Sequence, residues 1–229
     1  MASIAYPGLE LKLFEQAHNW KSYWSSRIAP FVRGSVLEVG AGIGTNTRLL
    51  ASLDFARWTC LEPDPALAHQ IELPPGGRHG LTLGTIDDLF AGEQFDSILY
   101  IDVLEHIAED GAEMARAAAR LKPGGALIVL SPAHPFLFTP FDEAIGHYRR
   151  YTRATLRHAA PPCLTEVGVT YLDSVGMLAS LGNRLLLGQS MPTAQQIGVW
   201  DRWMVPPSRI ADRLTGGLIG KSVLGVWSR

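Results

Sequence analysis

The sequence predicts an α/β fold, namely a doubly wound and mostly parallel sheet with helices on both faces. Short apolar runs alternate with helical segments between residues 35 and 130, and this alternation is typical of βαβ units. A glycine-rich turn, Gly40-Ala41-Gly42-Ile43-Gly44, joins the first apolar run to the next helical segment. The length of 229 residues fits one domain with a sizeable core.

The N-terminal part predicts a helical cap in two short pieces, because Trp20, Tyr23, Trp24 and Ile28 recur at helical spacing. The core that follows alternates strand and helix. Its expected strands are residues 35–39, 58–61, 81–83, 95–101 and 126–130. Its expected helices are residues 45–53, a helix beginning at Pro65 and residues 105–121.

The C-terminal part departs from this alternation. We expect a helix at residues 152–160, a strand at 165–172 and a final strand at 223–227. About fifty residues separate these two strands, which is long for a connection. Helices at 178–187 and 208–214 are expected there, covering one end of the sheet. The predicted single domain therefore divides into an N-terminal helical segment (1–33), a cofactor-binding core (34–175), a helical insertion (176–221) and a last strand (222–229).

Composition excludes several classes of protein. The 20 Lys and Arg against 22 Asp and Glu give a net charge of −2, unlike the basic excess of a general nucleic-acid binder. Hydrophobic residues make up 47% of the chain, which excludes a mostly disordered protein. Cys60 and Cys163 are too few for a disulfide scaffold or a cysteine zinc site, and indicate free thiols. With no signal-like start and no apolar run long enough to span a membrane, we expect a cytoplasmic protein.

The glycine turn carries the strongest functional signal. Glycines allow a sharp turn and a close approach of the backbone to a ligand, and Glu62 ends the second strand, where an acid can bond a ribose diol. The third glycine comes earlier than in the dinucleotide fingerprint, and Glu38 precedes the first. A carboxylate there disfavours a pyrophosphate and favours a ligand with an ammonium group and no phosphate, as in S-adenosylmethionine. The alternative is a glycine turn with a structural role only.

Four segments occur in the order found in one enzyme family. They are residues 36–44 (VLEVGAGIG), 61–64 (LEPD), 95–107 (FDSI followed by DVLEHI) and 121–125 (LKPGG). With these segments the chain resembles a class I S-adenosylmethionine-dependent methyltransferase. Residues 141–142 and 146–152 resemble a small bacterial subgroup of types 11 and 12. The resemblance implies a Rossmann-like sheet of seven strands with the last strand antiparallel.

The resemblance also implies which residues bind S-adenosyl-L-methionine. They are Trp20, Glu38, Gly40, Ala41, Gly42, Glu62, Pro63, Thr85, Ile86, Asp102, Val103 and His106. Glu38 and the glycine backbone would meet the methionine part, Glu38 through ordered water or at the ammonium group. Glu62 would bind both ribose hydroxyls, and Pro63 would pack near the adenine. The family often has Gly-Asp after the third strand, where this chain has Gly84-Thr85-Ile86. The contact with the adenine amino group is therefore left open between Thr85 and Asp87. For Trp20, ordinary helix packing is the alternative to closing over the cofactor.

Candidate catalytic residues follow the fifth strand, at the carboxyl edge where doubly wound sheets bind ligands. They are His134, Asp142 and His147. His134 as a general base is one hypothesis. The other is that positioning dominates, with Trp200 and Trp203 of the insertion lining the acceptor pocket. Two interpretations also remain for the charges after Asp142. Either Asp142 and its neighbour Glu143 pair with the basic group of His147, Arg149 and Arg150, or Arg149 or Arg150 holds an anionic substrate.

The sequence thus predicts a methyltransferase that acts on an oxygen or nitrogen atom of a small-molecule acceptor. No residues show metal-binding spacing, so no metal is expected. No nucleic-acid partner and no membrane span are expected, and the oligomeric state is left open. The alternatives are a lipid-linked or saccharide acceptor, and a regulatory protein that binds S-adenosylmethionine without catalysis.

Overall fold

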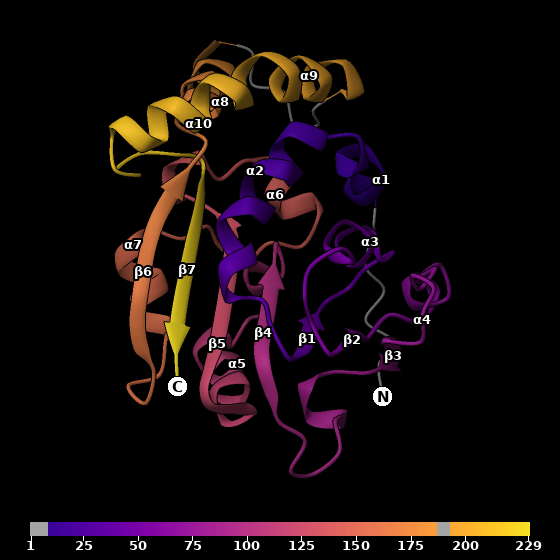
Figure 1. Cartoon of the computed structure of the whole chain (residues 1–229). Coiled ribbons are helices and arrows are strands. Elements are labelled where there is room, and N and C mark those ends of the chain that lie inside the picture. Colours follow the sequence, from indigo (N-terminus) through magenta and orange to yellow (C-terminus); the bar gives the residue numbers. More distant parts are fainter. Residues whose placement is uncertain (1–8, 187–192) are drawn as a thin grey trace.

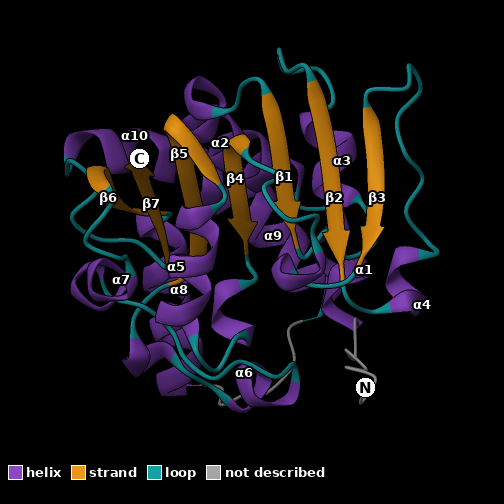
Figure 2. Ribbon diagram, turned by 90° about the horizontal axis from the view of Figure 1, so that it is seen from below, coloured by secondary structure: helices purple, strands orange, loops and turns teal. Residues whose placement is uncertain are grey.

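A computed structural model describes residues 9–186 and 193–229, which form a seven-stranded sheet with helices on both faces (Figures 1 and 2). The strand order is β3-β2-β1-β4-β5-β7-β6. The strands are β1 Ser35–Val39, β2 Arg57–Glu62, β3 His79–Leu83, β4 Phe95–Ile101, β5 Leu121–Pro132, β6 Thr165–Leu172 and β7 Ser222–Ser228. Only β7 runs antiparallel to its neighbours, β5 and β6, which confirms the predicted mostly parallel sheet.

The helices lie between the strands and at one end of the sheet. They are α1 Leu9–Glu15, α2 His18–Ile28, α3 Thr45–Leu50, α4 Pro65–Ala68, α5 Asp110–Ala119, α6 Pro140–Ala144, α7 Arg153–Ala159, α8 Ser174–Leu186, α9 Ala194–Val199 and α10 Val205–Leu214. Single 3-10 turns occur at Ala29–Phe31, Ile86–Asp88, Leu104–His106 and Pro135–Leu137, and a π-helical turn at Trp200–Met204 joins α9 to α10.

The two faces of the sheet carry separate apolar cores, because successive strand residues point to opposite faces. Val36 and Leu99 pack on the side of α2 and α3. Their chain neighbours Leu37 and Ile98 pack on the side of α5 and α7. Both cores are built from the apolar strands that the sequence shows as near-continuous runs, as expected of a sheet buried on both faces.

Two helix starts differ from the prediction by four residues or more. The helix expected from residue 105 begins at Asp110, and the preceding Leu104–His106 is a separate turn whose Glu105 carbonyl accepts a hydrogen bond from Tyr148 N. The helix expected from residue 178 begins at Ser174 instead, because the Asp173 carboxylate accepts the backbone N–H of Gly176 and caps it. Residue 187, the expected end of that helix, lies outside the described residues.

Helices from both ends of the chain form one layer over the carboxyl ends of the parallel strands (Figure 1). The Asp201 carboxylate accepts the backbone N–H groups of Asn19 at 3.1 Å and Trp20 at 2.8 Å, so the insertion caps the start of α2. Tyr23 donates a hydrogen bond to Asp212 at 2.9 Å. This layer of α1, α2, α8, α9 and α10 is called the cap below.

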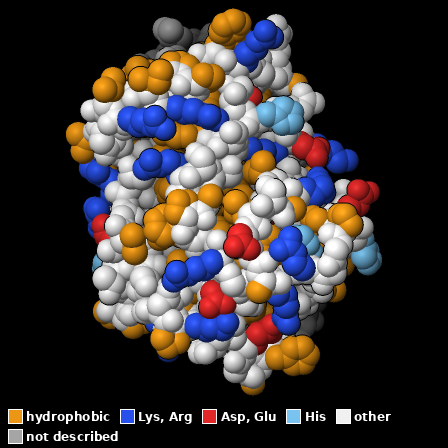
Figure 3. All heavy atoms as spheres, in the orientation of Figure 1, with side chains coloured by type: hydrophobic (Ala, Val, Ile, Leu, Met, Phe, Trp, Pro, Cys, Tyr) orange, Lys and Arg blue, Asp and Glu red, His pale blue; other side chains and the backbone are white. Residues whose placement is uncertain are grey.

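The outer surface of the cap is partly apolar (Figure 3). Trp203, Ile210 and Leu214 are 67%, 65% and 84% exposed. No helix in the described part of the chain is both long enough and apolar enough to cross a bilayer.

Candidate active site

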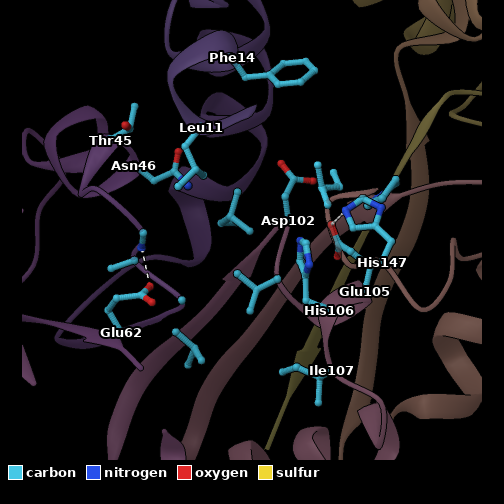
Figure 4. Close-up of a pocket in the computed structure, with 18 of the residues that line it drawn as sticks. Leu11, Phe14, Thr45, Asn46, Glu62, Asp102, Glu105, His106, Ile107 and His147 are labelled. Carbon is cyan, nitrogen blue, oxygen red and sulfur yellow. Dashed lines mark hydrogen bonds and ion pairs between the residues drawn. The ribbon is translucent and has the colours of Figure 1, made fainter. Parts of the chain in front are cut away.

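A cavity of about 660 Å³ lies between the carboxyl ends of β1, β2 and β4 and the cap (Figure 4). Its lining brings together all but one of the residues expected to bind the cofactor. These are Trp20, Gly40, Ala41, Gly42, Glu62, Pro63, Thr85, Ile86, Asp102, Val103 and His106. The exception is Glu38.

The glycine turn forms one wall of this cavity by a backbone path that requires glycine. Gly40, Gly42 and Gly44 have φ values of 68°, 58° and 76°, in the left-handed region that side chains disfavour. A Cβ on Gly40 would lie 2.6 Å from Val103 Cγ2, so that position is also too crowded for a side chain. The turn therefore brings bare backbone to the cavity, as a closely bound ligand requires.

Glu62 lies beside this turn at the end of β2, with its carboxylate on the cavity wall. Its Oε2 accepts the backbone N–H of Gly42 at 2.7 Å, and its Oε1 accepts that of Asp64 at 3.0 Å. Burial raises the pKa of Glu62, an effect that these two hydrogen bonds oppose. Each carboxylate oxygen has a second lone pair, so the fixed carboxylate can still accept hydrogen bonds from a diol. This donor set and the bare glycine backbone fit the ribose and methionine parts of S-adenosylmethionine.

Glu38 lies behind the glycine turn and does not line the cavity. Its Oε2 accepts hydrogen bonds from Thr47 Oγ1 at 2.6 Å and Trp58 Nε1 at 2.8 Å. Burial raises the pKa of this carboxyl to about 7. The side chain turns inward to hold β1, α3 and β2 together, so a direct contact with the methionine part finds no support here. A contact through ordered water stays a prediction.

Thr85 and Asp87 both line the cavity, so the structure leaves both as candidates for the adenine amino group. Thr85 N and Oγ1 both donate to Asp88 Oδ2, at 2.7 and 2.9 Å. Asp87 lies 3.6 Å from Arg116 Nε. Ile86, between them, is fully buried and offers an apolar surface.

Four polar side chains form the wall opposite Glu62: Asp102, Glu105, His106 and His147 (Figure 4). Asp102 follows β4 with a φ of 55°, and the protein around it raises its pKa to about 6 by desolvation. Desolvation lowers the pKa of His106 to about 4, and its ring meets that of His147 edge-on, with centroids 4.5 Å apart. The uncharged imidazole of His106 and the carboxyl of Asp102, whose pKa is raised, therefore face the same space.

Asp142 is fully buried at the edge of this wall and is held by basic partners. His147 Nδ1 hydrogen-bonds with its Oδ1 at 2.9 Å, and Arg150 Nε donates to the same atom at 2.8 Å. Burial alone would raise the pKa of Asp142, but these hydrogen bonds hold it well below its ordinary value. Arg149 pairs instead with Asp110 at 2.7 Å. Because it is ionised and already paired, Asp142 is unsuited to removing a proton, and the geometry matches the predicted pairing of Asp142 with His147 and Arg150.

His134 does not line the cavity. Its ring lies between Tyr171 and Phe136, with centroid distances of 4.5 and 5.0 Å. It follows β5 with a φ of 64° and directly precedes the 3-10 turn Pro135–Leu137. This placement does not support His134 as the base. Of the two tryptophans expected in the acceptor pocket, Trp200 lines the cavity, whereas Trp203 lies on the outer surface.

Lys221 also lines the cavity, although it was not predicted from the sequence to belong to the site. Its Nζ lies 3.6 Å from the centroid of the Trp200 ring and 3.7 Å from Asp173 Oδ2. Lys221 directly precedes β7, and the start of an antiparallel strand lies at the same edge as the ends of its parallel neighbours. Since the last strand was predicted to be antiparallel, the residue before it could have been predicted to lie at this edge of the sheet.

Comparison with known proteins agrees with this geometry. A family model described as a methyltransferase domain matches residues 15–162. A ubiquinone biosynthesis O-methyltransferase from Methylobacterium nodulans is 29% identical over 174 residues, which are 69% of each chain. A demethylmenaquinone methyltransferase from Tropheryma whipplei is 30% identical over 155 residues, covering 66% of this chain and 62% of that relative.

Solved structures show the same fold at low sequence identity. A methyltransferase from Archaeoglobus fulgidus superposes with a TM-score of 0.63 at 12% identity, covering 96% of this chain and all of that one. A methyltransferase from Haloferax volcanii, solved with its Trm112 activator, gives 0.62 at 18% identity, covering 96% of this chain and 92% of that one. The family match spans the glycine turn, Glu62 and the wall at Asp102. The chain belongs to the class I S-adenosylmethionine-dependent methyltransferases.

Proposed function

We propose that this protein transfers a methyl group from S-adenosylmethionine to an oxygen or nitrogen atom of a small-molecule acceptor. The observation that carries the proposal is that one cavity has two different ends. The glycine turn and Glu62 form one end. The other combines apolar surface from Phe141, Ile145 and Trp200 with polar groups, so it offers an acceptor both packing and orientation.

The cofactor supplies a methyl group already activated on a sulfonium. The task left to the chain is to hold both reactants in line and to exclude water. Glu62 and the glycine backbone would fix the cofactor, with Trp20 and Phe14 of the cap covering it. Trp20 and Trp200 pack together, with centroids 5.9 Å apart, so the same aromatic cluster touches both ends of the cavity.

The acceptor end favours a flat, partly polar molecule. Trp200 is fixed by a hydrogen bond from its Nε1 to Asp173 at 2.7 Å and by Lys221 over its ring. A fixed indole is suited to pack against another ring. Two relatives are named for O-methylation in ubiquinone biosynthesis and for methylation of demethylmenaquinone, which supports an aromatic acceptor. The exposed apolar side chains of the cap favour a lipid-linked acceptor as the second candidate.

We also place the reaction in the cytoplasm. Cys60 and Cys163 are both free thiols, Cys163 on the surface, as is usual in a reducing compartment.

The test is a screen of phenols, quinols and amines that measures release of S-adenosylhomocysteine by the full chain. The proposal expects release that depends on one class of acceptor. If the protein binds the cofactor product but release is the same with and without every acceptor, the regulatory alternative holds instead.

The acceptor wall is tested with a matched pair of tryptophans. Trp200→Ala removes the ring that lines the cavity and should lower kcat/KM by roughly 10²-fold through misplacement of the acceptor. Trp203→Ala removes an exposed ring and should leave turnover within about twofold, as a surface change usually does. Equal losses in the two variants would contradict the placement of the acceptor beside Trp200.

A further inference from the structure

Three side chains on the acceptor wall form a cluster with metal-ligand chemistry. Glu105 and His106 lie in the turn after β4, and His147 follows α6. One ligand atom from each lies within 4.8 Å of the other two (Figure 4). His147 lies about forty residues after Glu105 and His106, so the sequence shows no metal-binding spacing, and no metal was predicted from it.

Each imidazole is oriented by a partner at its other side. His147 Nδ1 hydrogen-bonds with Asp142, which directs Nε2 toward Glu105 Oε1 at 3.9 Å. His106 hydrogen-bonds with the backbone of Gly146. Histidines that ligate metals almost always use one nitrogen for the metal and the other for a carboxylate or a backbone carbonyl.

Asp142 is itself immobilised, as expected of a group that orients a ligand. Arg150 donates to both of its oxygens, at 2.8 and 3.0 Å, and Thr139 N donates to Oδ2 at 2.8 Å. The His147 ring is therefore fixed by a carboxylate that cannot move. This carboxylate–histidine arrangement reproduces the support that tunes and orients metal-bound imidazoles.

Glu105 gives an independent indication of a missing partner. Its side chain is fully buried, and Oε2 accepts a hydrogen bond from Ser131 Oγ at 2.9 Å. Its Oε1 has no hydrogen-bond partner in the part of the chain that the structure describes. A buried polar atom left unsatisfied is costly and calls for an explanation. Oε1 is the atom directed at His147, in the centre of the cluster.

We propose that Glu105, His106 and His147 bind a divalent transition-metal ion on the acceptor wall. Two imidazoles and one carboxylate are a donor set suited to zinc and to neighbouring divalent ions of the first transition series. Three protein ligands leave a coordination position open, and the cavity lies beside it. Resting on the proposed function, this position would take an oxygen of the acceptor, so the acceptor class is an alcohol, phenol or quinol rather than an amine.

The site is tested with Co²⁺ titrated into the chelator-treated full chain, followed by calorimetry and by Co²⁺ absorption. We expect one ion per chain. Glu105→Gln and His106→Gln should each weaken Co²⁺ binding by more than tenfold. Asp142→Asn changes none of the three ligands but alters the support of His147 and the pairing with Arg150, and it should weaken Co²⁺ binding roughly 10–100-fold. The control is His158→Gln on the exposed side of α7, which should change nothing.

A second measurement avoids variants that fail to fold. Co²⁺ bound at this site should shift and broaden the ring-proton NMR signals of His106 and His147 in the wild type. It should leave those of the exposed His69 and His158 unchanged. No saturable binding, or paramagnetic effects confined to His69 and His158, would overturn the proposal and leave Glu105 as a protonated partner of His147.

Binding of S-adenosylhomocysteine is measured on the same metal-free samples. If the product binds and Co²⁺ does not, the metal site fails while the proposed function stands. If Co²⁺ binds and the product does not, the proposed function fails while the metal site stands.

Discussion

The cofactor end of the cavity and the cap that covers it are assembled in different ways. At the cofactor end, the Gly40–Gly44 turn and Glu62 are joined by a 2.7 Å hydrogen bond between residues only 20 positions apart. In the cap, the start of α2 at Trp20 is held by Asp201, 181 positions away. The cofactor end therefore depends on local backbone conformation, and the cap on buried carboxylates that join distant segments.

Because of this difference, the cofactor end and the cap should respond differently to substitutions. A strained glycine turn fails when a side chain is added, whatever surrounds it. A helix start held by one carboxylate weakens when the carboxylate is removed, but the apolar contacts around it remain. Changes at the cofactor end should therefore act mainly on binding, and changes in the cap mainly on stability.

The largest effect should follow Gly42→Val. Gly42 has a φ of 58° and donates its N–H to Glu62, so a branched side chain strains the turn at the cavity wall. We expect no detectable binding of S-adenosylhomocysteine by calorimetry, with the far-UV circular dichroism unchanged. Gly92→Val is the matched control, because Gly92 has a φ of 81° with open space around it. Equal losses in both variants would show that strain alone, and not the cavity, causes the effect.

Glu38 gives the next effect, on stability rather than binding. Burial raises its pKa from 4.5 to about 7, so between these values the folded protein holds a proton that the unfolded chain releases. The free energy of unfolding should therefore fall as the pH rises through this window, by roughly 3 kcal/mol in total. Glu38→Gln removes this dependence, because an amide does not titrate.

Urea denaturation at about pH 5 and about pH 8 measures the effect. The variant should gain stability relative to the wild type at the higher pH, and the comparison cancels the other titrating groups. A stability difference that is the same at both pH values would contradict the buried placement of Glu38 behind the turn.

The smallest of the three effects should follow Asp201→Ala in the cap. The change leaves the backbone N–H groups of Asn19 and Trp20 without their acceptor, at a cost of about 1–2 kcal/mol in the free energy of unfolding. Affinity for S-adenosylhomocysteine should fall only severalfold, since Trp20 remains packed on Trp200. Asp54→Ala, in an exposed loop, is the control. A complete loss of binding in Asp201→Ala would contradict the view that changes in the cap act mainly on stability and changes at the cofactor end mainly on binding.

The sequence predicted the cofactor end well because its signals are local. The strand, the glycine turn and Glu62 follow one another in a spacing that backbone geometry imposes. Even there Glu38 does not line the cavity, because spacing locates a residue but does not say to which side of the turn its side chain points. The acceptor end was predicted less well, since His134 does not line the cavity, whereas Lys221, which was not predicted, does. The positions of His134 and Lys221 depend on how the loop after β5 and the start of β7 pack against the rest of the protein, and tertiary packing of this kind is not visible in local sequence patterns.

Glu62 gives the most direct test of the central claim, that the glycine turn and this carboxylate bind the cofactor. Calorimetric titration of S-adenosylhomocysteine should show Glu62→Ala binding 10–100-fold more weakly than the wild type, equivalent to roughly 1.5–3 kcal/mol for the loss of charge-assisted hydrogen bonds to the ribose. Glu72→Ala, at an exposed position just after α4, should bind like the wild type. An unchanged affinity in Glu62→Ala would contradict the account.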